Sequence, residues 1–173
     1  MNIQSSVNWH THKYYRKLLC HWIRKRIKPT TSIICNNCLG GRISQDLRYP
    51  YNSPTIGLFF NYPDYVDFLE NLKECVTTPI MFRKTSKYLP QVNYPIGYFN
   101  IDGKDIQVDF LHYATEKEAR EKWERRCKRV NWGDIVFIGS EQDGCNEQDI
   151  DRFVNIRKWG GESCLLPQRV IRS

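Results

Sequence analysis

The sequence predicts an α/β fold: a single domain whose mixed, mostly parallel sheet is flanked by helices and includes one antiparallel hairpin. Short apolar runs typical of buried strands alternate with segments whose apolar residues recur at helical spacing. Alternation of this kind is typical of α/β domains. In addition, Asp102-Gly103 separates two stretches of alternating residues, and this dipeptide is a strong hairpin signal.

The bulk composition fits a folded protein. The 173 residues are 40% hydrophobic and 13% aromatic, which is a globular composition, and a chain of this length suits one domain. No apolar run is long enough to span a membrane, and the N-terminus lacks the features of a secretory signal. The seven cysteines are odd in number and irregularly spaced, which predicts reduced thiols and a cytoplasmic location.

The first predicted unit, residues 1–29, is a basic amphipathic helix. Apolar residues recur at helical spacing over 9–28, and Pro29 ends the pattern. Residues 1–28 carry seven basic and no acidic side chains, whereas the remainder holds 19 of each sign. Because the body is neutral, we expect no nucleic-acid partner. The helix either docks on the body or makes peripheral contact with a membrane through residues 9–28.

The second unit, residues 30–156, holds the α/β elements. In its first half we expect strands at 31–36 and 55–60 and a short helix at 43–48. Tyr62-Pro-Asp64 opens a further helix, since proline favours the first helical turn. The apolar face of this helix comprises Tyr65, Phe68, Leu69, Leu72 and Val76.

In the second half of this unit, a short strand at 80–82 precedes the hairpin of residues 94–113. Thr115-Glu-Lys-Glu118 is a capping box that begins a helix. The buried stripe of that helix comprises Ala119, Trp123, Cys127 and Val130. A strand at 134–138 and a helix at 145–156 follow. The third unit, residues 157–173, is an atypical tail without a helical or strand period.

The candidate site begins where the first predicted strand ends, at Asn36-Asn37-Cys38. Ligands of open α/β sheets bind where strands end. We expect Gly40 and Gly41 to let the backbone approach a ligand or adopt positive φ. A tight strand-to-helix turn with polar caps is the alternative interpretation.

Cys38 and His112 form the predicted catalytic pair. A thiol beside an imidazole can act as an activated nucleophile, and Asn37 would donate to an oxyanion during acyl transfer. The alternatives are a small buried thiol at Cys38 and a hydrogen-bonded core histidine at His112. Cys35-x-x-Cys38 has no matching second pair and the histidines are scattered, so we predict no metal site.

Arg126 and Arg129 are predicted to bind a ligand phosphate. Along the helix from 116, four acids each precede a base by four residues, whereas Arg126 and Arg129 follow basic residues at that spacing. Two unpaired arginines beside a buried face need an anion from elsewhere. The alternative is a tertiary salt bridge to one of three acids: Asp109, Asp134 or Asp143.

With these motifs in place, the chain resembles a bacterial family of unknown function over about residues 30–155. The resemblance lies in the following segments: residues 33–41, Ser53-Pro54-Thr55, Leu111-His112-Tyr113, Lys122-Trp123, Arg126, Arg129 to Asn131 and Asp143-Gly144-Cys145. Members are described as exopolysaccharide or capsular polysaccharide biosynthesis proteins, some of them as acetyltransferases. The resemblance implies an α/β fold and a place in surface-glycan metabolism. The sequence departs from the family after about Ile156, and we interpret residues 157–173 as a truncated or frameshifted end.

Two functions follow as hypotheses. The first is a transferase of bacterial surface-polysaccharide synthesis that carries out acyl transfer from a donor of the coenzyme A type. The second is a noncatalytic glycan-binding or assembly protein attached to the inner membrane or to a partner enzyme through its basic helix. The tyrosines and tryptophans suit sugar stacking and suit an ordinary core equally.

Overall fold

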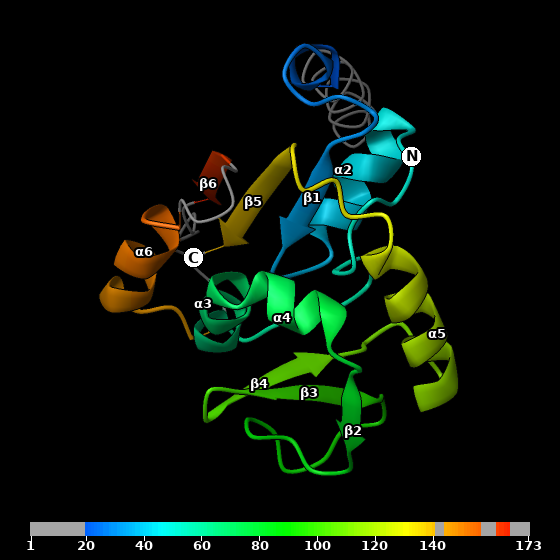
Figure 1. Cartoon of the computed structure of the whole chain (residues 1–173), viewed down its shortest axis with the longest axis vertical. Helices are drawn as coiled ribbons and strands as arrows, with labels where there is room; N and C mark the ends of the chain where they lie inside the picture. Colours follow the sequence, from blue (N-terminus) through cyan, green and yellow to red (C-terminus); the bar gives the residue numbers. More distant parts are fainter. Residues whose placement is uncertain (1–19, 141–143, 157–161, 167–173) are drawn as a thin grey trace, which may run out of the picture.

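The computed structural model describes residues 20–140, 144–156 and 162–166, and it contains two three-stranded sheets (Figure 1). The first sheet is parallel, with strand order β1-β5-β6, and the second is antiparallel, with order β2-β3-β4. The strands are β1 (Ser32–Cys35), β2 (Met81–Arg83), β3 (Ile96–Ile101), β4 (Lys104–Asp109), β5 (Ile135–Ser140) and β6 (Glu162–Leu166).

The mixed α/β class is confirmed, but the strands do not share the one mixed, mostly parallel sheet that we expected. The hairpin β3–β4 pairs with β2 and forms a sheet of its own. The expected strand 55–60 is mostly turn. Its end lies between the sheets: Phe59 exchanges two backbone hydrogen bonds with Asp109, and the Phe60 N–H donates to the Asn36 carbonyl at 2.8 Å. This short segment therefore joins two sheets.

Two helices differ from the predicted bounds. The helices are α2 (Leu39–Leu47), α3 (Tyr62–Glu70), α4 (Leu72–Thr77), α5 (Glu116–Cys127) and α6 (Glu147–Val154). Helix α2 begins directly after Cys38, four residues before the expected start at 43, and the helix from Tyr62 breaks at Asn71. A β-carbon at Gly40 would lie 3.0 Å from the Cys35 Cβ, so glycine lets α2 pack close to β1.

The remaining predicted elements lie close to their expected places. Thr115 caps α5 by accepting from the Glu118 N–H, so the predicted helix start is confirmed. The Glu118 carboxylate accepts from the Ala114 N–H, one residue before the position that a capping box uses. Asp102 and Gly103 both have positive φ, at 49° and 77°, as a two-residue hairpin turn requires. Residues 20–24 are helical, and the rest of the predicted helix 9–28 before them lies outside the described residues.

The expectation that residues 157–173 lack strand structure is wrong in part, because 162–166 form β6. This strand runs parallel to β5, with Cys164 beside Ile138. The backbone hydrogen bonds available along an exposed strand edge do not depend on a clear side-chain period, which explains why the pattern missed it.

Trp123 centres the core between the antiparallel sheet and the helices. Its ring lies 6.1 Å from the Phe68 ring, 5.5 Å from Phe99 and 6.4 Å from Phe110, measured between ring centres. The expected buried stripe of α5 is confirmed, since Trp123 is 2% exposed and Ala119 is fully buried. This cluster joins α5 to α3 and to β3, and thereby sets the position of the segment that follows β4.

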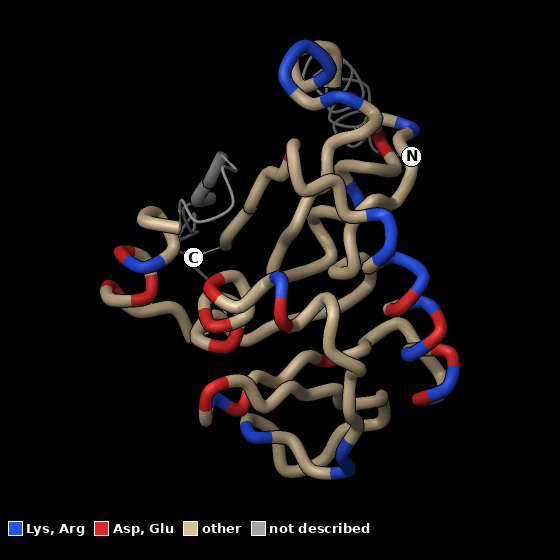
Figure 2. The backbone as a smooth tube through the Cα atoms, in the orientation of Figure 1, with Lys and Arg blue, Asp and Glu red and all other residues tan. Residues whose placement is uncertain are grey.

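Charged residues of both signs alternate along α5, whereas α3 carries acidic residues alone and α6 carries acidic residues together with Arg152 (Figure 2). Arg152 of α6 pairs with Asp67 at 2.6 Å and with Glu70 at 2.7 Å, and Lys104 of β4 also reaches both acids. The neighbouring Arg152 guanidinium lowers the pKa of Glu70. This network ties α6 and β4 to α3. In the described part of the chain, no helix is long and apolar enough to cross a membrane.

Candidate Cys–His site

Cys38 stands at the junction of β1 and α2. The strand ends at Cys35, and Cys38 is the N-cap residue of α2, with φ −67° and ψ −5°. Its carbonyl accepts from the Arg42 N–H at 3.1 Å, which closes the first helical turn. The side chain is exposed, so the alternative of a small buried thiol is wrong. The thiol thus lies at the carboxyl end of a parallel strand, where α/β proteins place ligand sites.

His112 reaches the same place from the other sheet. It lies in the turn after β4, where the Tyr113 N–H donates to the Phe110 carbonyl at 3.1 Å. Its Nε2 lies 3.1 Å from the Cys38 Sγ. The imidazole is exposed, so the interpretation of a core histidine is wrong. The two predicted catalytic residues are therefore in hydrogen-bond contact, one from each sheet.

Gly57 holds the His112 turn close to the first sheet. Its φ is +73°, a conformation that glycine adopts without strain. A β-carbon at Gly57 would lie 3.5 Å from the Tyr113 ring and 3.8 Å from the His112 Cβ. The Tyr113 hydroxyl donates to the Ile56 carbonyl at 2.9 Å. Residues 56–57 and 112–113 therefore pack directly on each other, and this packing brings the imidazole to the thiol.

The environment of Cys38 favours proton transfer to His112 over a preformed thiolate. Partial burial raises the pKa of the Cys38 thiol above its usual value. A thiol that keeps its proton beside an imidazole is the state from which a general base activates a nucleophile.

Asn37 is oriented by its own side-chain oxygen. Oδ1 accepts from the Leu39 N–H at 3.0 Å and from the Cys35 thiol at 3.5 Å. None of the described residues accepts a hydrogen bond from its Nδ2. The amide group is thus fixed by one end, and the other end remains a donor next to Cys38. This geometry is compatible with the predicted oxyanion role.

Gly40 and Gly41 do not form the flexible turn that the sequence suggested. Both lie in α2 and neither has a positive φ. A β-carbon at Gly41 would lie 3.4 Å from the Ile56 Cγ2, so both glycines serve close packing of α2. Burial raises the pKa of Cys35, and the backbone N–H groups of Asn37 and Gly40, which face its sulfur, oppose that rise. The Gly40 amide is therefore directed at Cys35.

Arg126 lies beside the pair, and its contacts within the described residues are with neutral groups. One nitrogen, Nη1, donates to the Ile56 carbonyl at 2.6 Å and to the Tyr113 hydroxyl. The guanidinium carbon lies 5.7 Å from the centre of the Tyr51 ring. A tertiary salt bridge to Asp109 or Asp134 is not formed, and Asp143 lies outside the described residues. Among the described residues, the guanidinium is held by neutral groups only and has no ion-pair partner.

Arg129 is exposed in the turn that follows α5, where its N–H donates to the Arg126 carbonyl at 2.9 Å. Among the described residues, no side-chain contact ties Arg129 to Cys38, His112 or Tyr113. The two arginines therefore differ: Arg126 belongs to the site, whereas Arg129 is not brought to it.

A second polar centre escaped the sequence analysis. Gln107 on β4 is 1% exposed and uses both ends of its amide. Its oxygen accepts from Arg83 at 2.8 Å and from the Lys87 N–H at 2.9 Å. Its nitrogen donates to the Ser86 hydroxyl at 2.8 Å and to Asp109 at 2.9 Å. The connection between β2 and β3 is thus locked onto the sheet.

Asp64 extends this centre to α3. It accepts from the Gln107 N–H at 3.0 Å and from the Lys87 ammonium at 2.7 Å. Burial raises the pKa of both Asp64 and Asp109. The sequence pattern that could have indicated this polar centre is the polar face of the predicted hairpin, where Gln107 and Asp109 alternate with apolar residues. Within the described residues, no group of three or more potential ligands is placed to hold a metal ion.

Comparison with known proteins places the chain in a family. A family model described as a domain of unknown function, DUF1919, matches residues 10–158. The chain is also similar to an uncharacterised protein of Haemophilus influenzae, with 32% identity over 151 residues that make up 87% of this chain and 68% of that protein. The chain belongs to the DUF1919 family.

Proposed function

We propose that the protein is a cysteine-dependent transferase that carries out acyl transfer, with Cys38 as nucleophile and His112 as general base. The contact of 3.1 Å between Sγ and Nε2 carries this proposal. A thiol and an imidazole at this distance, exposed at a strand end, provide the nucleophile and the general base that nucleophilic catalysis requires.

In the first half-reaction, Nε2 of His112 takes the thiol proton while the Cys38 sulfur attacks the donor carbonyl. The bond to the leaving group breaks, and the leaving group takes the proton back from His112. In the second half-reaction, His112 removes a proton from an acceptor hydroxyl, which attacks the thioester. The Cys38 sulfur leaves and recovers the proton.

Two further groups support this reaction. The Nδ2 of Asn37 would donate to the oxyanion that forms on the attacked carbonyl. The guanidinium of Arg126, which pairs with no acid in the described part of the chain, would hold an anionic part of the donor, such as a phosphate of a coenzyme A type carrier. Arg126 suits this task because Ile56 and Tyr113 fix one of its nitrogens and leave the others for a ligand.

The acceptor is proposed from the family resemblance alone. Members of the family that the sequence resembles are described as exopolysaccharide or capsular polysaccharide biosynthesis proteins. We therefore propose that the acceptor is a sugar hydroxyl of a bacterial surface polysaccharide. Such a transfer would take place in the cytoplasm, in solution or at the inner membrane.

Mass spectrometry of the intact protein after incubation with acetyl coenzyme A tests the proposal. We expect an added acetyl group on the wild-type chain, none on Cys38→Ala and slower formation on His112→Gln. Cys20→Ala is the matched control, because Cys20 is a partly exposed thiol away from His112. Acetylation that persists in Cys38→Ala would reject the nucleophile.

A noncatalytic assembly protein is the second candidate, and one observation favours it. Trp22 is 54% exposed and the Arg26 guanidinium lies 3.8 Å from its ring centre. Exposed tryptophan among exposed cations is typical of segments that lie on anionic membranes. Sedimentation with vesicles that contain phosphatidylglycerol would test attachment. Loss of binding in Trp22→Ala would support it, and absence of binding by the wild-type chain would exclude it.

A further inference from the structure

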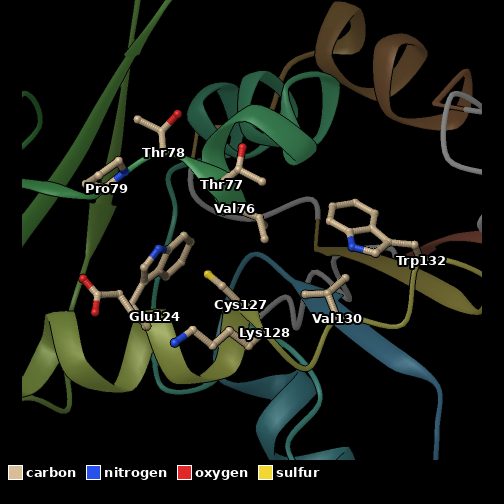
Figure 3. A pocket seen from close by; sticks show the side chains of 10 residues that line it. Val76, Thr77, Thr78, Pro79, Glu124, Cys127, Lys128, Val130 and Trp132 are labelled. Carbon is tan, nitrogen blue, oxygen red and sulfur yellow. The ribbon is translucent and has the colours of Figure 1, made fainter.

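A hollow lies between the ends of α4 and α5, away from the Cys38–His112 pair (Figure 3). Its volume is about 540 Å³, within the range of small-molecule sites. The apolar part of its lining comprises Val76, Pro79, Trp123, Cys127, Val130 and Trp132. Figure 3 shows the Cys127 thiol and Val76 pointing toward each other, with Trp132 on the far side from Glu124.

The interior of this hollow is uncharged. Burial raises the pKa of Cys127 to about 12, so its thiol is neutral at physiological pH. Trp132 is 39% exposed and presents an indole surface to the opening. A ligand that enters therefore meets sulfur, branched aliphatic groups and indole, which suit an apolar side chain.

The rim carries two opposite charges that do not neutralise each other. Glu124 and Lys128 both line the hollow and stand four residues apart on α5, in the order that favours pairing. On the same helix, Glu118 and Lys122 have the same spacing and pair at 2.7 Å. Among the described residues, neither Glu124 nor Lys128 has an ion-pair partner. The rim thus offers one carboxylate and one ammonium to a ligand.

This hollow is separate from the proposed acyl-transfer site. Glu124 and Lys128 occupy one flank of the buried stripe formed by Trp123 and Cys127 on α5. Arg126 occupies the other flank and reaches Ile56 and Tyr113. An inference about the hollow therefore does not depend on the chemistry of Cys38.

We propose that the hollow binds a free α-amino acid with an apolar side chain. The ammonium of the ligand would face Glu124, its carboxylate would face Lys128, and its side chain would enter between Val76 and Trp132. A zwitterion matches the rim in both signs, whereas a ligand with a single charge leaves one rim charge desolvated and unpaired.

Titration of the full chain with L-phenylalanine and L-leucine, followed by tryptophan fluorescence and calorimetry, tests this inference. We expect saturable binding with a dissociation constant in the millimolar range or tighter. Phenethylamine lacks the carboxylate and 3-phenylpropionate lacks the ammonium, and each should bind at least about tenfold more weakly than phenylalanine. Absence of binding by both amino acids up to about 10 mM overturns the proposal.

Variants locate the bound amino acid. Glu124→Gln and Lys128→Gln should each weaken phenylalanine binding by about tenfold or more, because each removes one charge-assisted contact. Glu121→Gln is the matched control, since Glu121 is an exposed acid of α5 that does not line the hollow. Cys38→Ala should bind phenylalanine as the wild type does. Unchanged affinity in both rim variants, or binding of either singly charged analogue as tight as that of phenylalanine, would reject the assignment.

Discussion

The Cys38 sulfur and the His112 Nε2 lie 3.1 Å apart although 74 positions separate them in the chain. Each comes from the end of a strand in a different sheet, so their contact depends on how the sheets are joined. The contact therefore depends on the packing around Gly57 as well as on the two side chains themselves.

Alkylation of Cys38 by iodoacetamide should become faster as pH rises and should still increase near pH 9. Partial burial raises the pKa of the thiol, so only a minor fraction is thiolate at pH 7. In His112→Gln, alkylation at pH 7 should be slower, because no neighbouring base then takes the thiol proton. Peptide mass spectrometry would follow Cys38 itself. A rate that is already maximal at pH 7 would contradict a raised pKa.

Tyr113→Phe should destabilise the protein by about 1–2 kcal/mol, because the hydroxyl donates to the Ile56 carbonyl and accepts from Arg126. If Arg126 holds the donor, the variant should also raise KM for the donor more than it lowers kcat. Urea unfolding and initial-rate kinetics measure the two effects. Tyr98→Phe is the control. Tyr98 contacts Arg83 through its ring, so removal of its hydroxyl should change stability and kinetics little.

Gln107→Leu should cost about 3 kcal/mol or more, because the buried partners of Gln107 would lose their hydrogen bonds together. The connection over residues 84–95 should then open, since Ser86 and the Lys87 N–H both bond to the Gln107 amide. Limited trypsin digestion should cut faster after Lys84 and Lys87. Asn93→Ala, an exposed change in the same connection, should leave the cleavage rate unchanged.

Asp109→Asn should reduce the pH dependence of stability. Burial raises the pKa of Asp109 in the folded state, so between the unfolded and folded pKa values the native protein binds more protons than the unfolded chain. Stability therefore falls as pH rises through this window, which begins near the ordinary pKa of about 3.9. The asparagine variant lacks this component. Urea unfolding from pH 4 to 7 should show its stability rising relative to wild type, and a constant difference would contradict the assignment.

Gly97→Ala should destabilise the antiparallel sheet by about 1–3 kcal/mol through overpacking. A β-carbon at this position would lie 2.7 Å from both the Ile80 Cδ1 and a Phe110 ring carbon. Both side chains are fully buried and have little room to shift. Thermal unfolding measures the change. Gly133→Ala, whose nearest neighbour would be 3.7 Å away, should remain within about 0.5 kcal/mol of wild type.

Local signals explain what could be predicted from the sequence. Strand β1, the Asp102-Gly103 turn and the start of α5 at Thr115 each follow from a few adjacent residues, and the structure confirms them. The early start of α2 was missed because Gly40 and Gly41 disfavour a helix in isolation. Their close packing on Cys35 and Ile56 compensates, and that packing is a tertiary contact.

The division into two sheets could not be predicted, because strand partners are chosen across long sequence separations. The candidate site was partly predictable: residue chemistry suggested Cys38, His112 and Arg126, but not the Ile56 carbonyl and Tyr113 hydroxyl that hold the arginine. The Gln107 centre was missed because a polar residue on an alternating strand normally faces water. Here the Ser86–Lys87 segment covers it.

The strip formed by Phe59 and Phe60 bonds to Asp109 on one side and to Asn36 on the other. It helps to set the distance between the two sheets near the site, since Asn36 stands two positions before Cys38 and Asp109 stands three positions before His112. Any tilt of one sheet against the other would therefore change the distance between the Cys38 Sγ and the His112 Nε2. A fluorescent dye attached to Cys38 would consequently report how the two sheets are aligned, whatever reaction the protein performs.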